Sequence, residues 1–114
     1  MKNIEILAPA GDSSCFLSAI AAGATAIYFG IGTFNARVRA VNIQQKELSS
    51  LVSIAKFYNV RTYLTLNILI KDDEFIQAID LVEFATNCGI DAIIVQDIGL
   101  LYILKKLFKN IEIH

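Results

Sequence analysis

The most chemically suggestive pattern in this chain is a pair of arginines, Arg37 and Arg39, at alternate positions of the otherwise uncharged segment 34–42. A guanidinium group presents a planar set of N–H donors that matches carboxylate and phosphate oxygens two at a time. Two such groups in one loop suit a dianion or a nucleic-acid backbone. In the alternative interpretation they are solvated or form ion pairs with Asp12 or Asp97, and the residues alone leave both interpretations open.

Other polar candidates come at the ends of apolar stretches, where parallel α/β folds place their sites. Asn67 and Gln96 follow or end such stretches, and an amide there can orient a ligand, although Asn is also a common turn residue. Asp97 fits the N-cap of a helix, with ligand contact as the alternative. The one histidine, His114, is expected beside the same edge. The candidate substrate-binding residues are Arg37, Arg39, Asn67, Gln96, Asp97 and His114, and no catalytic residue is assigned.

Elements that alternate between strand and helix must position these residues. Strands are predicted at Ile4–Ala8, Ala26–Gly30, Thr62–Leu66, Ala92–Val95 and Ile111–Ile113. The middle three lack strict polar alternation, which indicates parallel strands that are buried on both faces. Helical spacing between the strands predicts core positions at Phe16, Ile20, Leu48, Leu51, Val52, Ala55, Phe75, Ile79, Val82, Leu100, Leu104 and Leu107.

The predicted helix ends agree with this alternation. N-caps are predicted at Asp12, at Asp72 or Asp73, and at Asp97, and glycines that suit a positive φ at helix C-termini are Gly23 and Gly89. The segments 23–27 and 89–93 share one pattern, as expected of a repeating architecture. Right-handed crossovers then order the strands sequentially. The predicted fold class is α/β, the first half of a TIM-type (β/α)8 barrel with four β/α units and a fifth strand.

Length and composition limit the classes of protein. A complete barrel takes roughly 250 residues, so residues 1–114 are expected to be an N-terminal fragment of a barrel domain. Hydrophobic residues make up 55% of the chain, yet no apolar run reaches the ~18 residues of a membrane span. The net charge of −1 argues against a general electrostatic grip on nucleic acid or lipid. A cytoplasmic protein without a membrane partner is expected.

The chain carries no familiar catalytic motif. Cys15 and Cys88 lie far apart in apolar helical patterns and outside any C-x-x-C pair, which predicts two buried structural thiols. No metal or cofactor site is therefore expected within residues 1–114. The sequence has no G-x-S-x-G elbow, no H-E-x-x-H helix, no phosphate-binding P-loop and no dinucleotide fingerprint. Protease chemistry has no visible support in these residues.

Two segments carry a resemblance to a known family. Residues 7–12 (LAPAGD) and 34–42 (FNARVRAVN) resemble the start of the bacterial collagenase-like peptidases, the family numbered thirty-two among peptidases of unclassified type. The resemblance runs from about Ile6 to the last residue. It implies that Arg37 and Arg39 belong to the arginine-bearing segment of the family, which favours a functional role. It also implies that the barrel continues beyond residue 114, toward a later group of cysteines.

The resemblance leaves three functions open. The family name implies a hydrolase, a peptidase of collagenase-like type. Similar proteins hydroxylate bases of transfer or ribosomal RNA, or a quinone precursor, with iron–sulfur clusters held by the later cysteines. Hydroxylation is slightly favoured, because two arginines suit RNA or a dicarboxylate cosubstrate better than they suit peptide cleavage. The expected partner of the intact protein is RNA or a small anionic or cyclic substrate, or a peptide if it is a peptidase. In the third interpretation residues 1–114 alone are an inactive half-barrel whose open edges and apolar face drive self-association.

Overall fold

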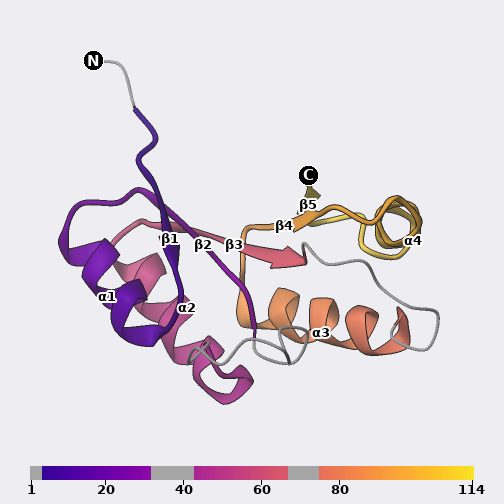
Figure 1. Ribbon diagram of the computed structural model, residues 1–114, viewed down its shortest axis with the longest axis horizontal. Coiled ribbons are helices and arrows are strands. Elements are labelled where there is room, and N and C mark those ends of the chain that lie inside the picture. The colour runs from indigo at the N-terminus through magenta and orange to yellow at the C-terminus, as the bar shows by residue number, and fades with distance from the viewer. Residues whose placement is uncertain (1–3, 32–42, 67–74) are drawn as a thin grey trace.

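The computed structural model describes residues 4–31, 43–66 and 75–114, which form an α/β structure with one parallel sheet (Figure 1). The strands of this part of the chain are β1 (Leu7–Ala10), β2 (Ala26–Phe29), β3 (Arg61–Leu66), β4 (Ala92–Val95) and β5 (Glu112–Ile113). They are joined by α1 (Ser13–Ala21), the short 3-10 helix η2 (Gln45–Glu47), α2 (Leu48–Phe57), α3 (Phe75–Cys88) and α4 (Ile98–Leu107). Each strand pairs with the next in chain order and in parallel, which confirms the predicted order and direction.

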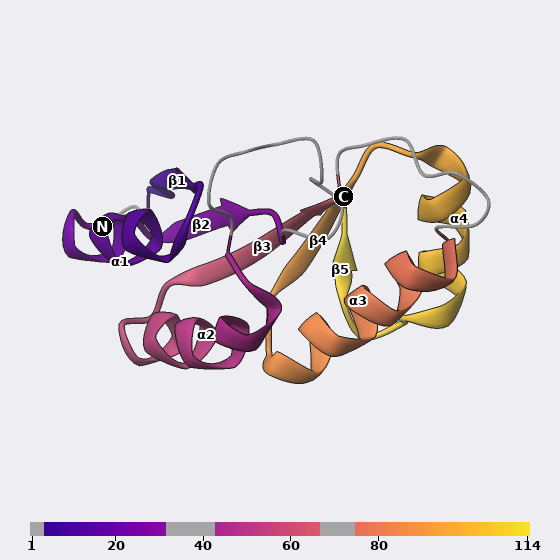
Figure 2. The same ribbon diagram turned by 60° about the horizontal axis from the view of Figure 1, so that its bottom comes forward.

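One face of the sheet packs against the helices (Figures 1 and 2). The strands send Ile27, Phe29, Leu64 and Ile93 to this side, and each is at most 2% exposed. Their buried helical partners are Phe16 of α1, Leu48, Leu51, Val52 and Ala55 of α2, Ala78, Leu81, Val82 and Ala85 of α3, and Leu100 and Leu104 of α4. Right-handed crossovers that keep every helix on one side place successive strands side by side, so the one-sided core and the sequential order have the same cause.

The other face carries polar and aromatic side chains, and we call it the open face. The strand register lines up Pro9, Tyr28, Tyr63, Ala92 and Glu112 in one row across it. Along β3, the buried residues Thr62, Leu64 and Leu66 alternate with the exposed or half-buried Arg61, Tyr63 and Thr65. Burial on both faces, predicted for the middle strands, is therefore wrong for β3. Alternate side chains of a strand point to opposite sides, and the helices lie on only one of them.

The first strand begins and ends later than predicted. It spans Leu7–Ala10 rather than Ile4–Ala8, so Pro9 lies within the strand instead of ending it. In the described sheet β1 is an outer strand that pairs with β2 alone. Proline is tolerated there because its missing N–H removes no bond that a central strand would need. The other strands begin and end within one residue of their predicted bounds.

Two side chains predicted for the core are exposed. Cys15 lies in the first turn of α1, where its neighbour Phe16 takes the core position, so the prediction of a buried thiol is wrong for this residue. Leu107 is 57% exposed at the end of α4, and Phe108 packs against the core in its place. Cys88 is half-buried at the end of α3, and this burial raises the pKa of its thiol.

Three helices end in the same way. Each of α1, α2 and α3 is followed by a residue with positive φ: Gly23 at 98°, Asn59 at 62° and Gly89 at 101°. The next residues, Ala24, Val60 and Ile90, are buried, and their N–H groups donate to the carbonyl five residues earlier at 3.0, 2.8 and 3.3 Å. This is the Schellman ending of a helix. The two glycines are confirmed in the predicted role, and Asn59 fills the same place where the sequence has no glycine.

The residue before β2 and the residue before β4 each clamp the neighbouring strand with two hydrogen bonds. The N–H of Thr25 donates to the Ile6 carbonyl at 2.9 Å, and its Oγ1 accepts from the Ile6 N–H at 2.7 Å. In the same way, the N–H of Asp91 donates to the Thr62 carbonyl at 2.9 Å, and its Oδ2 accepts from the Thr62 N–H at 2.8 Å. The two segments that share a sequence pattern therefore build the same junction twice.

The junction after α2 can be tested at Asn59. A left-handed backbone costs an ordinary L-residue about 1–2 kcal/mol, whereas glycine adopts it freely and asparagine pays less than alanine. We expect Asn59→Gly to keep or raise the free energy of unfolding and Asn59→Ala to lower it by about 1 kcal/mol, as measured by urea denaturation. Gly23→Ala is the control, because open space surrounds its new Cβ and only the backbone cost remains. An Asn59→Ala protein as stable as the unaltered one would contradict this role.

Candidate functional site

The carboxyl ends of three strands meet at one edge of the sheet, which we call the carboxyl edge. The N–H of Gln96, just past β4, lies 3.5 Å from the carbonyl oxygen of Leu66, the last residue of β3. The N–H of Val95 donates to the carbonyl of His114, which follows Ile113 in the pairing with β4, at 2.9 Å. Gln96 and His114 therefore lie at the edge where the sequence predicts them, while their role in binding stays a prediction.

Two carboxylates at this edge cap helices. Asp97 accepts a hydrogen bond from the N–H of Leu100 at 2.9 Å and begins α4. Asp12, just past β1, accepts from the N–H of Cys15 at 2.8 Å and begins α1. Hydrogen bonds from Cys15 favour the charged form and lower the pKa of Asp12. Both predicted N-caps are confirmed.

Several predicted site residues lie outside the described part of the chain. These are Arg37, Arg39 and Asn67, and the cap candidates Asp72 and Asp73. Ile31 and Ile43, the described residues on either side of 32–42, form a parallel bridge and are 3% and 0% exposed. This buried bridge lies just beyond the carboxyl end of β2.

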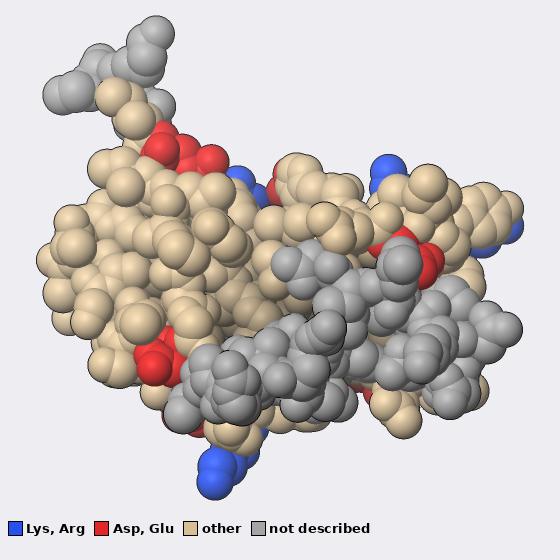
Figure 3. Space-filling view, in the orientation of Figure 1, with Lys and Arg blue, Asp and Glu red and all other residues tan. Residues whose placement is uncertain are grey.

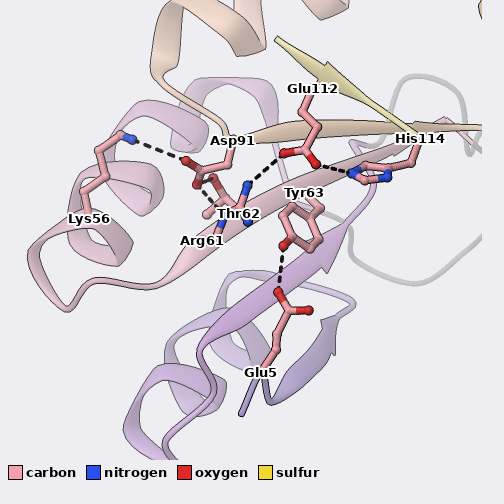
Figure 4. A network of polar contacts seen from close by, with 8 residues as sticks. All are labelled: Glu5, Lys56, Arg61, Thr62, Tyr63, Asp91, Glu112 and His114. Carbon is pink, nitrogen blue, oxygen red and sulfur yellow. Dashed lines mark hydrogen bonds and ion pairs between the residues drawn. The ribbon is translucent and has the colours of Figure 1, made fainter. Parts of the chain in front are cut away.

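The side chain of His114 takes part in a chain of polar contacts on the open face (Figure 4). Its Nε2 lies 2.9 Å from Oε2 of Glu112, and Oε1 of Glu112 accepts from Nη2 of Arg61 at 3.0 Å. The hydrogen bond to Glu112 raises the pKa of Arg61 above its usual range, so the guanidinium stays charged. This contact joins β3 to β5 across β4.

Tyr63 lies beside that chain of contacts. Its hydroxyl donates to Oε2 of Glu5 at 2.7 Å, and its ring centre lies 6.5 Å from that of His114 and 5.3 Å from the Arg61 guanidinium carbon. Burial, reinforced by the bond to Glu5, raises the pKa of Tyr63. The phenol therefore stays neutral near pH 7 and acts as a hydrogen-bond donor.

Arg61, Tyr63 and Glu112 were not predicted from the sequence as site residues. A signal was present, because Arg61, Tyr63 and Thr65 alternate with residues that are buried, and Glu112 stands two positions before His114. Period-two alternation puts each of these sets on one face. Only the strand register shows that the two sets meet.

Two hollows in the described surface lie away from the carboxyl edge. A depression of about 460 Å³ at the amino ends of the strands is lined by Ile4, Glu5, Thr25, Asn59 and Arg61. Another, of about 410 Å³, lies between α1 and α2 and is lined by Leu17, Ile20, Ala21, Ile54 and Tyr58. No charged residue occurs in α1, and Figure 3 shows a broad surface on that side with few charged atoms.

The described residues contain neither a grouped set of metal ligands nor a membrane-spanning helix. Within 4–31, 43–66 and 75–114, no group of three or more His, Cys, Asp or Glu side chains is arranged to hold a metal ion. In the same ranges, no helix has the length and apolar character needed to cross a membrane.

Comparison with known proteins places the chain in a family. Residues 11–114, which include the arginine-bearing segment and the whole carboxyl edge, match peptidase family U32. The chain belongs to this family. The resemblance predicted from segments 7–12 and 34–42 is confirmed.

Similar proteins of known name are of two kinds, RNA-hydroxylating proteins and a collagenase. The 23S rRNA 5-hydroxycytidine synthase of Escherichia coli is 40% identical over 86% of this chain and 15% of its own length. A collagenase of Porphyromonas gingivalis is 30% identical over 100% of this chain and 27% of its own. The tRNA hydroxylation protein P1 of Bacillus subtilis is 28% identical over 99% of this chain and 27% of its own. The chain thus spans at most 27% of the length of these relatives. No solved structure matches it.

The capping role of Asp97 can be separated from a role in binding. Asparagine is as good an N-cap as aspartate, and alanine costs about 1 kcal/mol there. We expect Asp97→Ala to lower the free energy of unfolding by about 1 kcal/mol and Asp97→Asn to preserve most of it, by urea denaturation. If Asp97 is only a helix cap, the Asp97→Asn protein should also be as active in cells as the unaltered protein. Loss of activity at full stability would instead assign a binding role to the charge.

Proposed function

We propose that this chain forms part of an enzyme that hydroxylates ribosomal or transfer RNA, and that its carboxyl edge binds the RNA. The observation that carries the proposal is the 40% identity to an RNA hydroxycytidine synthase over 86% of this chain. A relative named for tRNA hydroxylation supports the same class of substrate. A quinone precursor is the alternative substrate for hydroxylation that the sequence resemblance implies. It has less support than RNA.

The sheet is proposed to be the first part of a (β/α)8 barrel. Sequential parallel strands, helices packed on one face and a junction repeated along the chain all fit that architecture. In such a barrel the open face would point inward, and the site would lie at the carboxyl ends of the strands. The candidate residues at the carboxyl edge agree with that location.

The proposed RNA contact is the arginine-bearing segment. Arg37 and Arg39 supply two guanidinium groups, and in the sequence they stand between Ile31 and Ile43, which form a buried bridge beyond the end of β2. Phosphate contacts of this kind hold an RNA in register, while amides and ring nitrogens read the bases. Gln96 and His114 lie at the same edge and suit the second task.

An iron–sulfur cluster, expected from the resemblance, does not fit the residues of this chain. A cluster is held mainly by cysteine thiolates, and the chain has two cysteines, one at the start of α1 and one at the end of α3. Its helices also offer no grouped acidic or histidine ligands in the described ranges. We therefore assign RNA binding to these residues and no part in holding an iron–sulfur cluster. A cluster would have to be held by cysteines later in the protein.

A peptidase is the second candidate function. The identity of 30% to a collagenase over 100% of this chain favours it. Against it, the sequence has no nucleophile motif and no zinc-binding helix motif. Self-association through the exposed Ile4, Ile6 and Leu7 beside β1 is the remaining alternative for residues 1–114 alone.

The RNA proposal predicts a change in cellular RNA. We expect that ribosomal or transfer RNA from cells lacking the gene contains a nucleoside one oxygen atom lighter at one position, by mass spectrometry of nuclease digests. The gene supplied on a plasmid should restore the oxygen. Unaltered RNA, together with gelatin cleavage by the purified full-length protein, would decide for the peptidase.

The arginine pair can be tested by RNA binding. In the full-length protein we expect Arg37→Ala with Arg39→Ala to weaken binding of deproteinised ribosomal RNA by about 2–3 kcal/mol, because two charge-assisted contacts are lost. The dependence of binding on salt should also become shallower. A control that removes the same charge is Lys105→Ala with Lys106→Ala, at the far end of α4. Equal losses from both pairs would point to general attraction, and a large loss of folding stability would assign the arginines to structural ion pairs.

A further inference from the structure

Glu112 lies at the centre of a chain of contacts that crosses the open face (Figure 4). One carboxylate oxygen accepts from Arg61 at 3.0 Å, and the other lies 2.9 Å from Nε2 of His114. Ala92 of β4 is the register partner of Glu112, between β3 and β5. Because Ala92 carries only a methyl group, the Arg61 side chain can reach over β4 to the carboxylate.

The contact with Glu112 leaves one nitrogen of His114 available. Within the described ranges Nδ1 has no hydrogen-bond partner, and Figure 4 shows it turned away from Glu112. A neutral imidazole that donates from Nε2 carries its lone pair on Nδ1 and accepts there. The backbone of His114 is also fixed, since its N–H donates to the Ile93 carbonyl at 2.8 Å and its carbonyl accepts from Val95 at 2.9 Å.

The ion pair on the open face can orient the ring of His114, because Glu112 contacts Arg61 through one oxygen and His114 through the other. An orienting role needs only that Arg61 limits the positions of Glu112 and that Glu112 limits those of the ring. Binding to a ring that is already oriented costs less, because the histidine side chain has less conformational entropy to lose.

We propose that Glu112 is a positioning residue for His114, and that Nδ1 of His114 accepts a hydrogen bond from an N–H or O–H donor of RNA. Exocyclic amino groups of bases and the ribose 2′-hydroxyl are the donors of that class. The inference rests on the proposed RNA function. It assigns to the His114 ring one contact at the carboxyl edge and to Glu112 the task of holding it.

A double-mutant cycle in the full-length protein tests whether Glu112 acts through His114. We expect Glu112→Gln and His114→Ala each to weaken binding of deproteinised ribosomal RNA about tenfold, the scale of one hydrogen bond. The double variant should bind no more weakly than His114→Ala alone. Glu5→Gln is the matched control, the same chemical change at a carboxylate bonded to Tyr63 rather than to His114, and should bind as the unaltered protein does. Additive losses in the cycle, or an equal loss from Glu5→Gln, would overturn the inference.

A second measurement needs no RNA and separates this inference from the proposed function. ¹³C relaxation of the His114 ring, assigned by the signal lost in His114→Gln, should show an ordered ring that becomes mobile in Glu112→Gln. Equal mobility in both proteins overturns the positioning role whatever the RNA result. An ordered ring that Glu112→Gln releases, in a protein that binds no RNA, supports positioning and overturns both the RNA contact and the proposed function.

Discussion

The structure depends on the return of each helix to the same face of the sheet. A left-handed residue at the end of α1, α2 and α3 turns the chain sharply, and the buried residue after it secures the turn against the core. Thr25 and Asp91 then bind the strand beside them through a backbone and a side-chain hydrogen bond. With the turn short and the next strand paired at once, successive strands lie side by side and all helices share one side.

One consequence is the character of the open face. The apolar strand residues face the helices. The alternate strand positions face the other way and carry residues such as Arg61, Tyr63 and Glu112. Arg61 and Glu112 form an ion pair there. Their arrangement suits orientation, because Arg61 donates to one oxygen of Glu112 and the other oxygen lies 2.9 Å from Nε2 of His114.

The carboxyl edge holds several polar groups and a buried bridge. Ile31 and Ile43 pair just beyond the carboxyl end of β2, and Gln96 follows β4. Asp97 is committed to the first turn of α4, which places its carboxylate at the same edge but gives it a structural task. Family U32 has members named for RNA hydroxylation and members named for proteolysis.

Features that depend on a few neighbouring residues could be predicted from the sequence alone. Periodicity located the strands after the first to within one residue, and the capping roles of Asp12 and Asp97 and the two glycine turns follow from chemistry within one helical turn. The helix ending at Asn59 was not predicted, because asparagine adopts a positive φ less often than glycine and so gives a weaker signal. Pro9 was predicted to end its strand, but a proline is accepted within β1 because β1 is an outer strand of the described sheet. Cys15 was predicted to be buried, but its neighbour Phe16 occupies the core position. The contact of Arg61 with Glu112 joins residues 51 positions apart. Only the assembled register of three strands, with a small residue at Ala92, decides that such residues meet.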